Sequence, residues 1–335
     1  MKKIVISRTD SIGDVILTLP MAGKLKEMIP GCTIVFLGRD YTQDIVSLSA
    51  FVDEFISWDQ IVKLESNKER VSAFKNIQAD IIIHVFPRKD IAWLAKNAGI
   101  QNRIGTSGRL YHYPTCNKRV KFSRRRSDLH EAQLNFKLLK PLGLDQTLNL
   151  KEIEKYYGLS NIPNLSDEFV SLIDPSRVNL IIHPKSKGSA REWGLENFQQ
   201  FIDLIDISRY KVFITGTEAE GKSLRKHIFF NKDCVDLSGK MKLGQLLAFI
   251  SKADALVAAS TGPLHIAAAF GKRAVGIYPP IKPMHPGRWA PIGKNADYLV
   301  LNKVCNDCRK EVKCLCMEEI KPKDVLQKLE EYFEN

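Results

Sequence analysis

The sequence predicts an α/β protein built from two similar halves, each with its own parallel sheet. Apolar runs typical of buried strands alternate with helix-like segments along both halves of the 335-residue chain. Between Leu144 and Arg177 the alternation weakens and prolines interrupt it, so we place a domain boundary there, with domains at 1–160 and 161–335. We expect the two halves to face each other across a cleft.

The first half alternates strand-like runs with helix-like stretches. Runs rich in isoleucine and valine predict strands over 3–8, 33–37, 52–57 and 81–86. Helical spacing of apolar residues predicts helices over 15–21, 42–49, 60–77, 91–99 and 130–142. Residues 103–126 lack either pattern and are expected to form a basic loop.

The second half repeats the alternation. Apolar runs predict strands over 180–183, 212–214, 235–237 and 255–258. Helices are predicted over 195–205, 219–229 and 243–252, followed by an alanine-rich helix from Pro263 to Gly271.

Composition and charge narrow the class of protein. Apolar residues make up 44% of the chain and charged residues 26%, as in soluble globular proteins. No apolar run approaches the roughly 18 residues that span a bilayer, and no signal peptide precedes the first strand, so we expect a cytoplasmic protein. The net charge of +12 favours an anionic partner: nucleic acid, an acidic membrane surface, or a phosphorylated or carboxylated substrate.

The turn Ser260-Thr261-Gly262-Pro263 carries the strongest local signal for a binding site. It joins a buried strand to a helix whose first turn contains Pro263 and His265. An open helix N-terminus presents unpaired N–H groups and a positive dipole end, which suit a phosphate or diphosphate. The alternative is an ordinary strand–helix turn in which His265 caps or packs.

A second candidate follows the first strand, in the loop Thr9-Asp10-Ser11-Ile12-Gly13-Asp14. The loop has neither the G-x-G-x-x-G pattern nor a P-loop, which disfavours a dehydrogenase. Asp14 lies at the mouth of a helix, where the dipole keeps a carboxylate ionised and available as a base. The alternative is that Asp10 or Asp14 simply caps the helix.

Two further loops follow strands of the second half. One carries Lys185, Ser186 and Arg191, and the other carries Glu220 in the stretch Thr215-Gly216-Thr217-Glu218-Ala219-Glu220. Cations and N–H groups suit a diphosphate, and a carboxylate suits ribose hydroxyls, so together with the Thr261 turn these loops favour a nucleotide.

The segment 117–126 carries six cations in ten residues, including Arg124, Arg125 and Arg126. Such a cluster binds phosphates or the anionic cytoplasmic leaflet, or it is a solvated surface loop. Phe122 is its single aromatic residue, which is poor support for stacking on nucleic acid.

Four cysteines lie close together near the C-terminus, at Cys305, Cys308, Cys314 and Cys316. They could hold a structural zinc ion, form a disulfide pair, or remain thiols. Paired C-x-x-C units with a longer spacer would indicate zinc more strongly.

Taken together, four stretches resemble the family 9 glycosyltransferases, the ADP-heptose:lipopolysaccharide heptosyltransferases. They are Ser11-Ile12-Gly13-Asp14, the loop from His183-Pro184 to Arg191-Glu192-Trp193, Gly216-x-x-x-Glu220, and Thr261-Gly262-Pro263-Leu264-His265 with the alanines that follow. The resemblance implies a GT-B fold of two Rossmann-like domains, with the acceptor on the first and the nucleotide sugar on the second. It implies inverting transfer of heptose from ADP-heptose to the lipopolysaccharide inner core, by a protein peripheral to the cytoplasmic face of the inner membrane.

The same resemblance assigns roles residue by residue. Asp14 matches the general base, Glu220 the ribose-binding acid, and Met241 a residue lining the adenine pocket. The diphosphate and donor contacts fall on Lys185, Ser186, Arg191, Ser260, Thr261, Gly262 and His265, and acceptor or phosphate contacts on Arg8, Ser11, Gly13, Arg124, Arg125 and Arg126.

Two departures and one missing motif qualify this assignment. Some members have Asp where this chain has Ser260, and the loss of this carboxylate leaves the identity of the donor sugar open. Some have Lys where this chain has Arg191, which keeps the charge and adds a fork but is not equivalent to Lys. No Asp-x-Asp motif occurs, so no metal or other cofactor is required, although dependence on Mg²⁺ stays open. The alternatives are a transferase that uses another nucleotide sugar and a nucleotide-binding protein without catalytic activity.

Overall fold

The computed structural model describes residues 1–186, 188, 190–282, 284–303, 305 and 314–334. The chain divides into two compact units, Met1–Asn161 and Ile162–Asn335. Each unit contains a six-stranded sheet whose paired strands all run parallel. The predicted pair of parallel sheets is therefore confirmed.

The first sheet has its first strand near the centre. In spatial order it contains β3 (Glu54–Ser57), β2 (Thr33–Gly38), β1 (Lys3–Ser7), β4 (Ile81–His84), β5 (Asn102–Thr106) and β6 (Lys118–Val120). Every residue of β4 is buried, as expected for a parallel strand covered on both faces.

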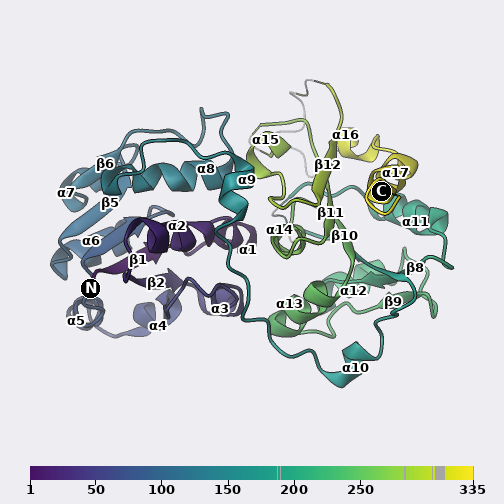
Figure 1. Ribbon diagram of the computed structural model, residues 1–335, viewed down its shortest axis with the longest axis horizontal. Helices are drawn as coiled ribbons and strands as arrows, with labels where there is room; N and C mark the ends of the chain where they lie inside the picture. The colour runs from purple at the N-terminus through teal and green to yellow at the C-terminus, as the bar shows by residue number, and fades with distance from the viewer. Residues whose placement is uncertain (187, 189, 283, 304, 306–313, 335) are drawn as a thin grey trace. The chain divides into compact units, whose positions relative to one another are not determined.

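Helices lie between these parallel strands along the chain and after the last of them (Figure 1). They are α1 (Ile12–Ile16), α2 (Pro20–Met28), η1 (Asp40–Thr42), α3 (Gln43–Ser47), α4 (Trp58–Lys63), α5 (Asn67–Asn76), α6 (Lys89–Asn97), α7 (His112–Thr115), α8 (Glu131–Phe136), η2 (Lys137–Leu142) and α9 (Leu150–Glu154).

The second sheet has the same topology as the first. Its spatial order is β12 (Ala296–Val300), β11 (Arg273–Tyr278), β10 (Ala255–Ala259), β7 (Val178–His183), β8 (Tyr210–Ile214) and β9 (Cys234–Asp236). The helices of this unit are α10 (Asp167–Val170), α11 (Leu195–Leu204), α12 (Glu218–Leu224), α13 (Leu243–Lys252), α14 (Gly262–Ala269), α15 (Pro286–Trp289), α16 (Leu315–Glu318) and α17 (Pro322–Glu330).

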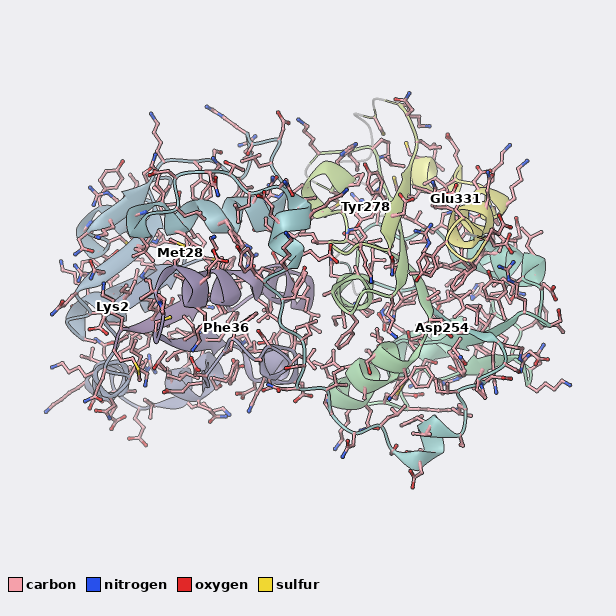
Figure 2. The ribbon with its side chains drawn as sticks, in the orientation of Figure 1. Lys2, Met28, Phe36, Asp254, Tyr278 and Glu331 are labelled. Carbon is pink, nitrogen blue, oxygen red and sulfur yellow. The ribbon has the colours of Figure 1, made fainter. Side chains whose placement is uncertain are left out.

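Each unit has its own apolar core between sheet and helices. In Figure 2, Phe36 lies on β2 within the first unit and Tyr278 lies on β11 within the second; both side chains are fully buried. The largest buried side chain of the second core is Trp193, whose indole N–H donates to the carbonyl of Ile320 at 2.9 Å. This bond ties the loop after β7 to the C-terminal helices.

The structure corrects several predicted elements. The segment 103–126 is not a continuous loop, because β5, α7 and β6 lie within 102–120. The two strands are short and polar, and pairing of β5 with β4 and of β6 with β5, rather than local pattern, stabilises them. The helix predicted over 60–77 is two helices, because Ser66 caps α5 in a capping box with Glu69. The strands β11 and β12 extend the second sheet beyond the predicted elements.

The strand order places the loops of interest. In both sheets the direction of chain progression reverses at the central pair, β1 and β4 in the first and β7 and β10 in the second. Ligands of open α/β sheets bind outside the carboxyl ends of strands at such a reversal. The loop 8–14 follows β1, and the Thr261 turn follows β10, so each unit has a predicted site at its own reversal point. Within the described residues, no helix has both the length and the hydropathy of a membrane span.

Candidate functional site

The loop after β1 is organised by a buried arginine. Arg8 is only 3% exposed, and its Nε donates to Asp10 Oδ1 at 2.6 Å. Its Nη1 donates to Glu131 Oε1 and to Asn135 Oδ1, both at 3.2 Å, and its Nη2 donates to Asp14 Oδ1. Arg8 therefore connects the loop after β1 to the first turns of α8 instead of presenting its charge at the surface.

Asp14 occupies the third position of α1, and neither it nor Asp10 caps that helix. The N-cap is Ser11, whose side chain makes no capping hydrogen bond, so the capping alternative for both aspartates is wrong. The Asp14 side chain is 17% exposed, and its Oδ1 is held by Arg8. Among the described residues, no hydrogen bond reaches Oδ2, so one carboxylate oxygen stays available to accept a proton.

The charges around Arg8 shift two pKa values. Burial opposes the charge on Arg8, but the carboxylates of Asp14, Asp10 and Glu131 together raise its pKa above the ordinary value. Burial raises the pKa of Asp10 to about 6, against the lowering effect of Arg8. Asp10 is thus partly protonated in mildly acidic solution.

The three arginines of the basic segment lie in different surroundings. Arg124 is half-buried and donates to Glu131, to Asn135 Oδ1 at 3.0 Å and to the carbonyl of Val85 at 3.1 Å. Arg125 and Arg126 are exposed. Ser11 is also exposed and Gly13 is half-buried, so the predicted acceptor residues include both surface groups and members of the buried cluster.

In the second unit, the start of α14 is open, as the sequence indicates. The N-cap Thr261 makes no side-chain capping bond, and its hydroxyl, in a side chain only 4% exposed, has no hydrogen-bond partner among the described residues. Gly262 begins the helix and Pro263 follows, with the buried His265 on the first turn. A buried hydroxyl beside uncapped N–H groups is a setting that an anion would satisfy.

The neighbouring helix α12 begins differently. Its N-cap Thr217 forms a capping box with Glu220: the Thr217 N–H donates to Glu220 Oε2 at 2.7 Å, and the Glu220 N–H donates to Thr217 Oγ1 at 3.3 Å. The carboxylate predicted to bind ribose therefore has one oxygen already engaged. Of these two helix starts, only that of α14 lacks a side-chain cap.

The loop after β7 carries its own ion pair. Lys185 Nζ contacts Glu192 Oε2 at 2.6 Å, and the N–H of Ser186 donates to Glu192 Oε1 at 3.1 Å. Arg191 is half-buried in the same loop. Because β7 and β10 are paired in register, with His183 beside Ala258, this loop and the Thr261 turn leave the sheet next to each other. The structure thus brings the predicted cations and the open helix start to one edge of the second sheet.

Two further predicted contacts lie near this edge. Ser260 hydrogen-bonds to Tyr278, whose pKa is raised mainly by burial. Met241 is half-buried in the loop between β9 and α13.

The cysteine cluster lies partly outside the described residues, because Cys308 is among those not described. Cys314 and Cys316 are buried, and the thiol of Cys316 interacts with that of Cys305. Within the part of the chain that the structure describes, no group of three or more His, Cys, Asp or Glu is arranged to hold a metal ion. A zinc site remains a prediction.

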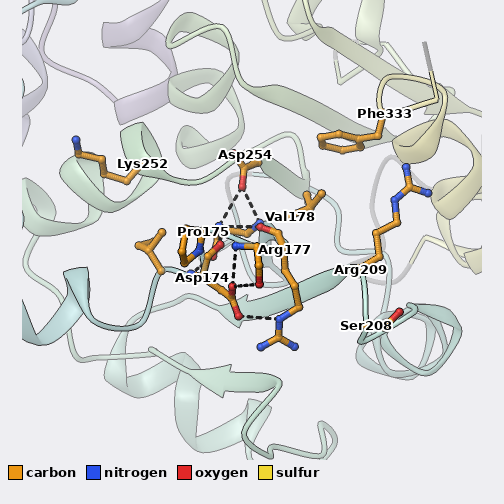
Figure 3. A pocket seen from close by; sticks show the side chains of 12 residues that line it. Asp174, Pro175, Arg177, Val178, Ser208, Arg209, Lys252, Asp254 and Phe333 are labelled. Carbon is orange, nitrogen blue, oxygen red and sulfur yellow. Dashed lines mark hydrogen bonds and ion pairs between the residues drawn. The ribbon is translucent and has the colours of Figure 1, made fainter.

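A cavity of about 720 Å³ lies elsewhere in the second unit, at the amino end of β7 (Figure 3). Its charged lining residues include Asp174, Arg177, Arg209 and Asp254. Arg177 pairs with Asp174 and Asp233, each at 2.8 Å, and Asp254 accepts from the N–H of Asn179 at 2.8 Å. Arg177, Asp174 and Asp254 are thus engaged in local contacts, and the cavity lies at the opposite end of the strand from the predicted nucleotide loops.

Sequence reasoning missed Glu131 and Asn135, which complete the cluster around Arg8. Both are fully buried polar residues on α8. The sequence did offer one signal for these residues: a carboxylate and an amide lie four positions apart on a predicted helix, so they share one helix face. Their partner Arg8 lies more than 120 residues earlier, so the pattern alone does not reveal the contact.

Comparisons with known proteins agree on one family. The family model described as "Glycosyltransferase family 9 (heptosyltransferase)" matches residues 71–317. A Haemophilus influenzae protein named "Putative glycosyltransferase" is 26% identical over 303 residues, covering 87% of this chain and 86% of its own length. "Lipopolysaccharide core heptosyltransferase OpsX" of the same organism is 30% identical over 117 residues, which are 34% of this chain and 33% of that protein.

The fold comparison leads to the same group of proteins. The structure of E. coli ADP-heptose lps heptosyltransferase II superimposes with a TM-score of 0.78 at 19% identity, covering 100% of both chains. This agreement confirms the GT-B class predicted for the two parallel sheets. Since the family model covers well over half of the sequence, the chain belongs to glycosyltransferase family 9, the heptosyltransferase family.

Proposed function

We propose that this protein transfers a heptose from ADP-heptose to a lipopolysaccharide inner-core acceptor, with inversion and with Asp14 as general base. The observation that carries the proposal is the state of the Asp14 carboxylate. Arg8 holds Oδ1, while Oδ2 has no partner among the described residues and the side chain is partly exposed. A base must be oriented and must also have an oxygen available for the proton, and this carboxylate meets both needs.

The proposed reaction is a single displacement. An acceptor hydroxyl attacks the anomeric carbon as the bond from that carbon to the diphosphate oxygen breaks, and the hydroxyl proton passes to Asp14 Oδ2. ADP leaves with an additional negative charge. The open start of α14, with Thr261 and Gly262, and the cation of Arg191 would stabilise this charge as it develops.

The names of the similar proteins support the donor and acceptor classes. The E. coli structure is named for ADP-heptose, and the Haemophilus influenzae relative is named for the lipopolysaccharide core. The exposed cations Arg125 and Arg126 fit an acceptor bearing carboxylates or phosphates, or the anionic cytoplasmic face of the inner membrane to which the protein would bind peripherally.

A transferase for another nucleotide sugar is the second candidate, and Ser260 favours it. A carboxylate at this position could contact the hydroxyls of a donor sugar, whereas Ser260 already hydrogen-bonds to Tyr278. The two candidate functions therefore differ in which sugar is transferred, and both are glycosyl transfer.

Calorimetric titration with ADP, UDP, GDP and NAD at fixed ionic strength tests the donor site. We expect selective ADP binding that is lost in Arg191→Ala. Preference for UDP or GDP would move the function to another glycosyl donor, and no nucleotide binding at all would refute the transferase.

Turnover of ADP-heptose with a Kdo-containing lipid A acceptor tests the chemistry. Asp14→Asn should bind ADP as the wild type does and lose nearly all turnover, since the missing group acts only in the transition state. Turnover that survives this substitution would show that the base lies elsewhere.

A further inference from the structure

The buried cluster around Arg8 joins three segments that are distant in the sequence. Arg8 and Asp14 come from the loop and helix after β1, Arg124 from the segment after β6, and Glu131 from the start of α8. Glu131 is 1% exposed, and its Oε1 accepts from both guanidinium groups. Glu131 is therefore the point at which the basic segment and the Asp14 loop meet.

The charges of the cluster do not cancel. Asp10, Asp14 and Glu131 face Arg8 and Arg124, so three carboxylates meet two guanidinium groups and leave one formal negative charge. Glu131 is the carboxylate that both guanidinium groups share, and it holds Arg8 from the α8 side while Asp10 and Asp14 hold it from the loop side. The position of Arg8, and with it Asp14 Oδ1, thus depends in part on Glu131.

A neutral route reinforces the same connection. The amide of Asn135 donates to the carbonyl of Leu17 and to Thr18 Oγ1, each at 3.2 Å. The hydroxyl of Thr18 in turn donates to the backbone carbonyl of Asp14 at 2.8 Å. The helix α8 is therefore linked to Asp14 in two ways: through Arg8, which holds the Asp14 side chain, and through Asn135 and Thr18, which reach the Asp14 backbone.

We infer that Glu131 and Arg8 are positioning residues for Asp14: Glu131 holds the guanidinium of Arg8, and Arg8 holds one oxygen of Asp14 so that the other can accept the proton of the acceptor. This inference rests on the proposed role of Asp14 as base. It gives Arg8 a role inside the cluster in place of the direct acceptor contact expected from the sequence. It also gives Arg124 a link to the catalytic loop that Arg125 and Arg126 lack.

The inference predicts an electrostatic signature that a purely structural role would not produce. Removing the negative charge in Glu131→Gln makes the remaining carboxylates easier to ionise, so the acidic limb of the kcat–pH profile should move to lower pH. Removing the positive charge in Arg8→Met should move that limb to higher pH. We expect a shift of about 1–3 pH units in Arg8→Met, because the guanidinium contacts Asp14 directly, and a smaller shift of about one unit in Glu131→Gln.

Other charged groups face this cluster and stay unchanged in both variants. Asp10 lies against Arg8, with its pKa raised by burial to about 6, and Tyr41 donates to the Asp10 carbonyl at 2.6 Å. Arg39 and Asp59 also act on Tyr41 and pair with each other. Because these groups are common to both variants, opposite shifts can come only from the opposite charges removed.

The experiment measures release of ADP from ADP-heptose with a Kdo-containing lipid A acceptor, from pH 5 to 9. Glu131→Gln and Arg8→Met should lower kcat at least tenfold while the KM for ADP-heptose stays within twofold, because the donor loops lie in the other unit. Arg8→Lys keeps the charge but loses the fork geometry, so it should recover part of kcat and leave the acidic limb near its wild-type position.

Asp233→Asn is the matched control. Asp233 is a buried carboxylate paired with Arg177 in the second unit, at the end of the sheet away from the predicted nucleotide loops. It should lower the melting temperature as the cluster variants do, without moving the pH profile. If Glu131→Gln fails to fold, the Arg8 half of the inference is still tested: the acidic limb should move to higher pH in Arg8→Met and stay near its wild-type position in Arg8→Lys, and a limb unmoved in Arg8→Met would refute the role of Arg8.

The outcomes separate the inference from the function on which it rests. Turnover retained by Asp14→Asn would refute Asp14 as the base. If Asp14→Asn abolishes turnover but the acidic limb shifts in the same direction in Glu131→Gln and Arg8→Met, or in neither, the positioning role is wrong while the base assignment stands.

Discussion

His84 provides a quantitative test of how burial controls the first unit. It is the last residue of β4, pairs in register with Ser7 of β1, and is 1% exposed. Neither ring nitrogen has a hydrogen-bond partner among the described residues, and the ring of His112 lies 5.6 Å away between centroids. Burial, together with smaller effects of the charges on His112 and Arg103, lowers the pKa of His84 to about 3.

The depressed pKa makes stability depend on pH in a defined direction. The unfolded chain takes up a proton on this histidine as the pH falls through its ordinary value of 6.5, whereas the folded protein does so only near pH 3. The contribution of neutral His84 is therefore complete above pH 6.5 and is lost below it. Between pH 7 and pH 5 the loss is about 2 kcal/mol, since the full cost of about 1.4 kcal/mol per pH unit applies only below pH 6.5.

Urea unfolding at pH 7 and pH 5 measures this loss. In His84→Leu the pH-dependent loss should be about 2 kcal/mol smaller than in the wild type, because the other titrating groups are unchanged. The leucine also replaces the imidazole without removing a hydrogen bond. His227→Leu, on an exposed histidine, serves as control and should follow the wild type.

Equal losses in the wild type and in His84→Leu would refute the reasoning. They would mean that protonated His84 finds a partner or water in the folded protein at no cost. The position matters for function because β4 lies beside β1, whose carboxyl end leads into the Arg8 cluster.

Three more predictions follow from local geometry. Thr261→Val should weaken ADP binding about tenfold in calorimetry, because one hydrogen bond to a charged group is lost. Thr217→Val, at the capped start of α12, should instead lower the melting temperature, because loss of the cap costs about 1 kcal/mol of stability. Gly105→Ala should destabilise the first unit by roughly 1–3 kcal/mol in urea unfolding, because its Cβ would lie 2.7 Å from His112 Nδ1 and 2.9 Å from Cys116 Sγ. Turnover should be unchanged by excess EDTA if helix dipole and cations alone stabilise the leaving diphosphate, and loss of turnover restored by Mg²⁺ would contradict this.

The sequence by itself determined the features that arise from short-range pattern. Buried parallel strands such as β4 and β10 are continuous apolar runs, and they are recognisable without tertiary information. The turn from Ser260 to Pro263 shows an open helix start in four residues, because glycine, proline and the cap position act locally. The loop that contains Asp14 could be recognised for the same reason, because it directly follows the first strand in the sequence.

Only the tertiary structure decided which polar groups meet. The strands β5 and β6 have few apolar residues and depend on pairing with their neighbours, so pattern alone read them as a loop. Glu220 reads as an available acid, yet its carboxylate closes the capping box of its own helix. The partners of Arg8 on α8 lie more than 120 residues away in the sequence, and the energy of bringing buried charges together depends on the complete fold around them.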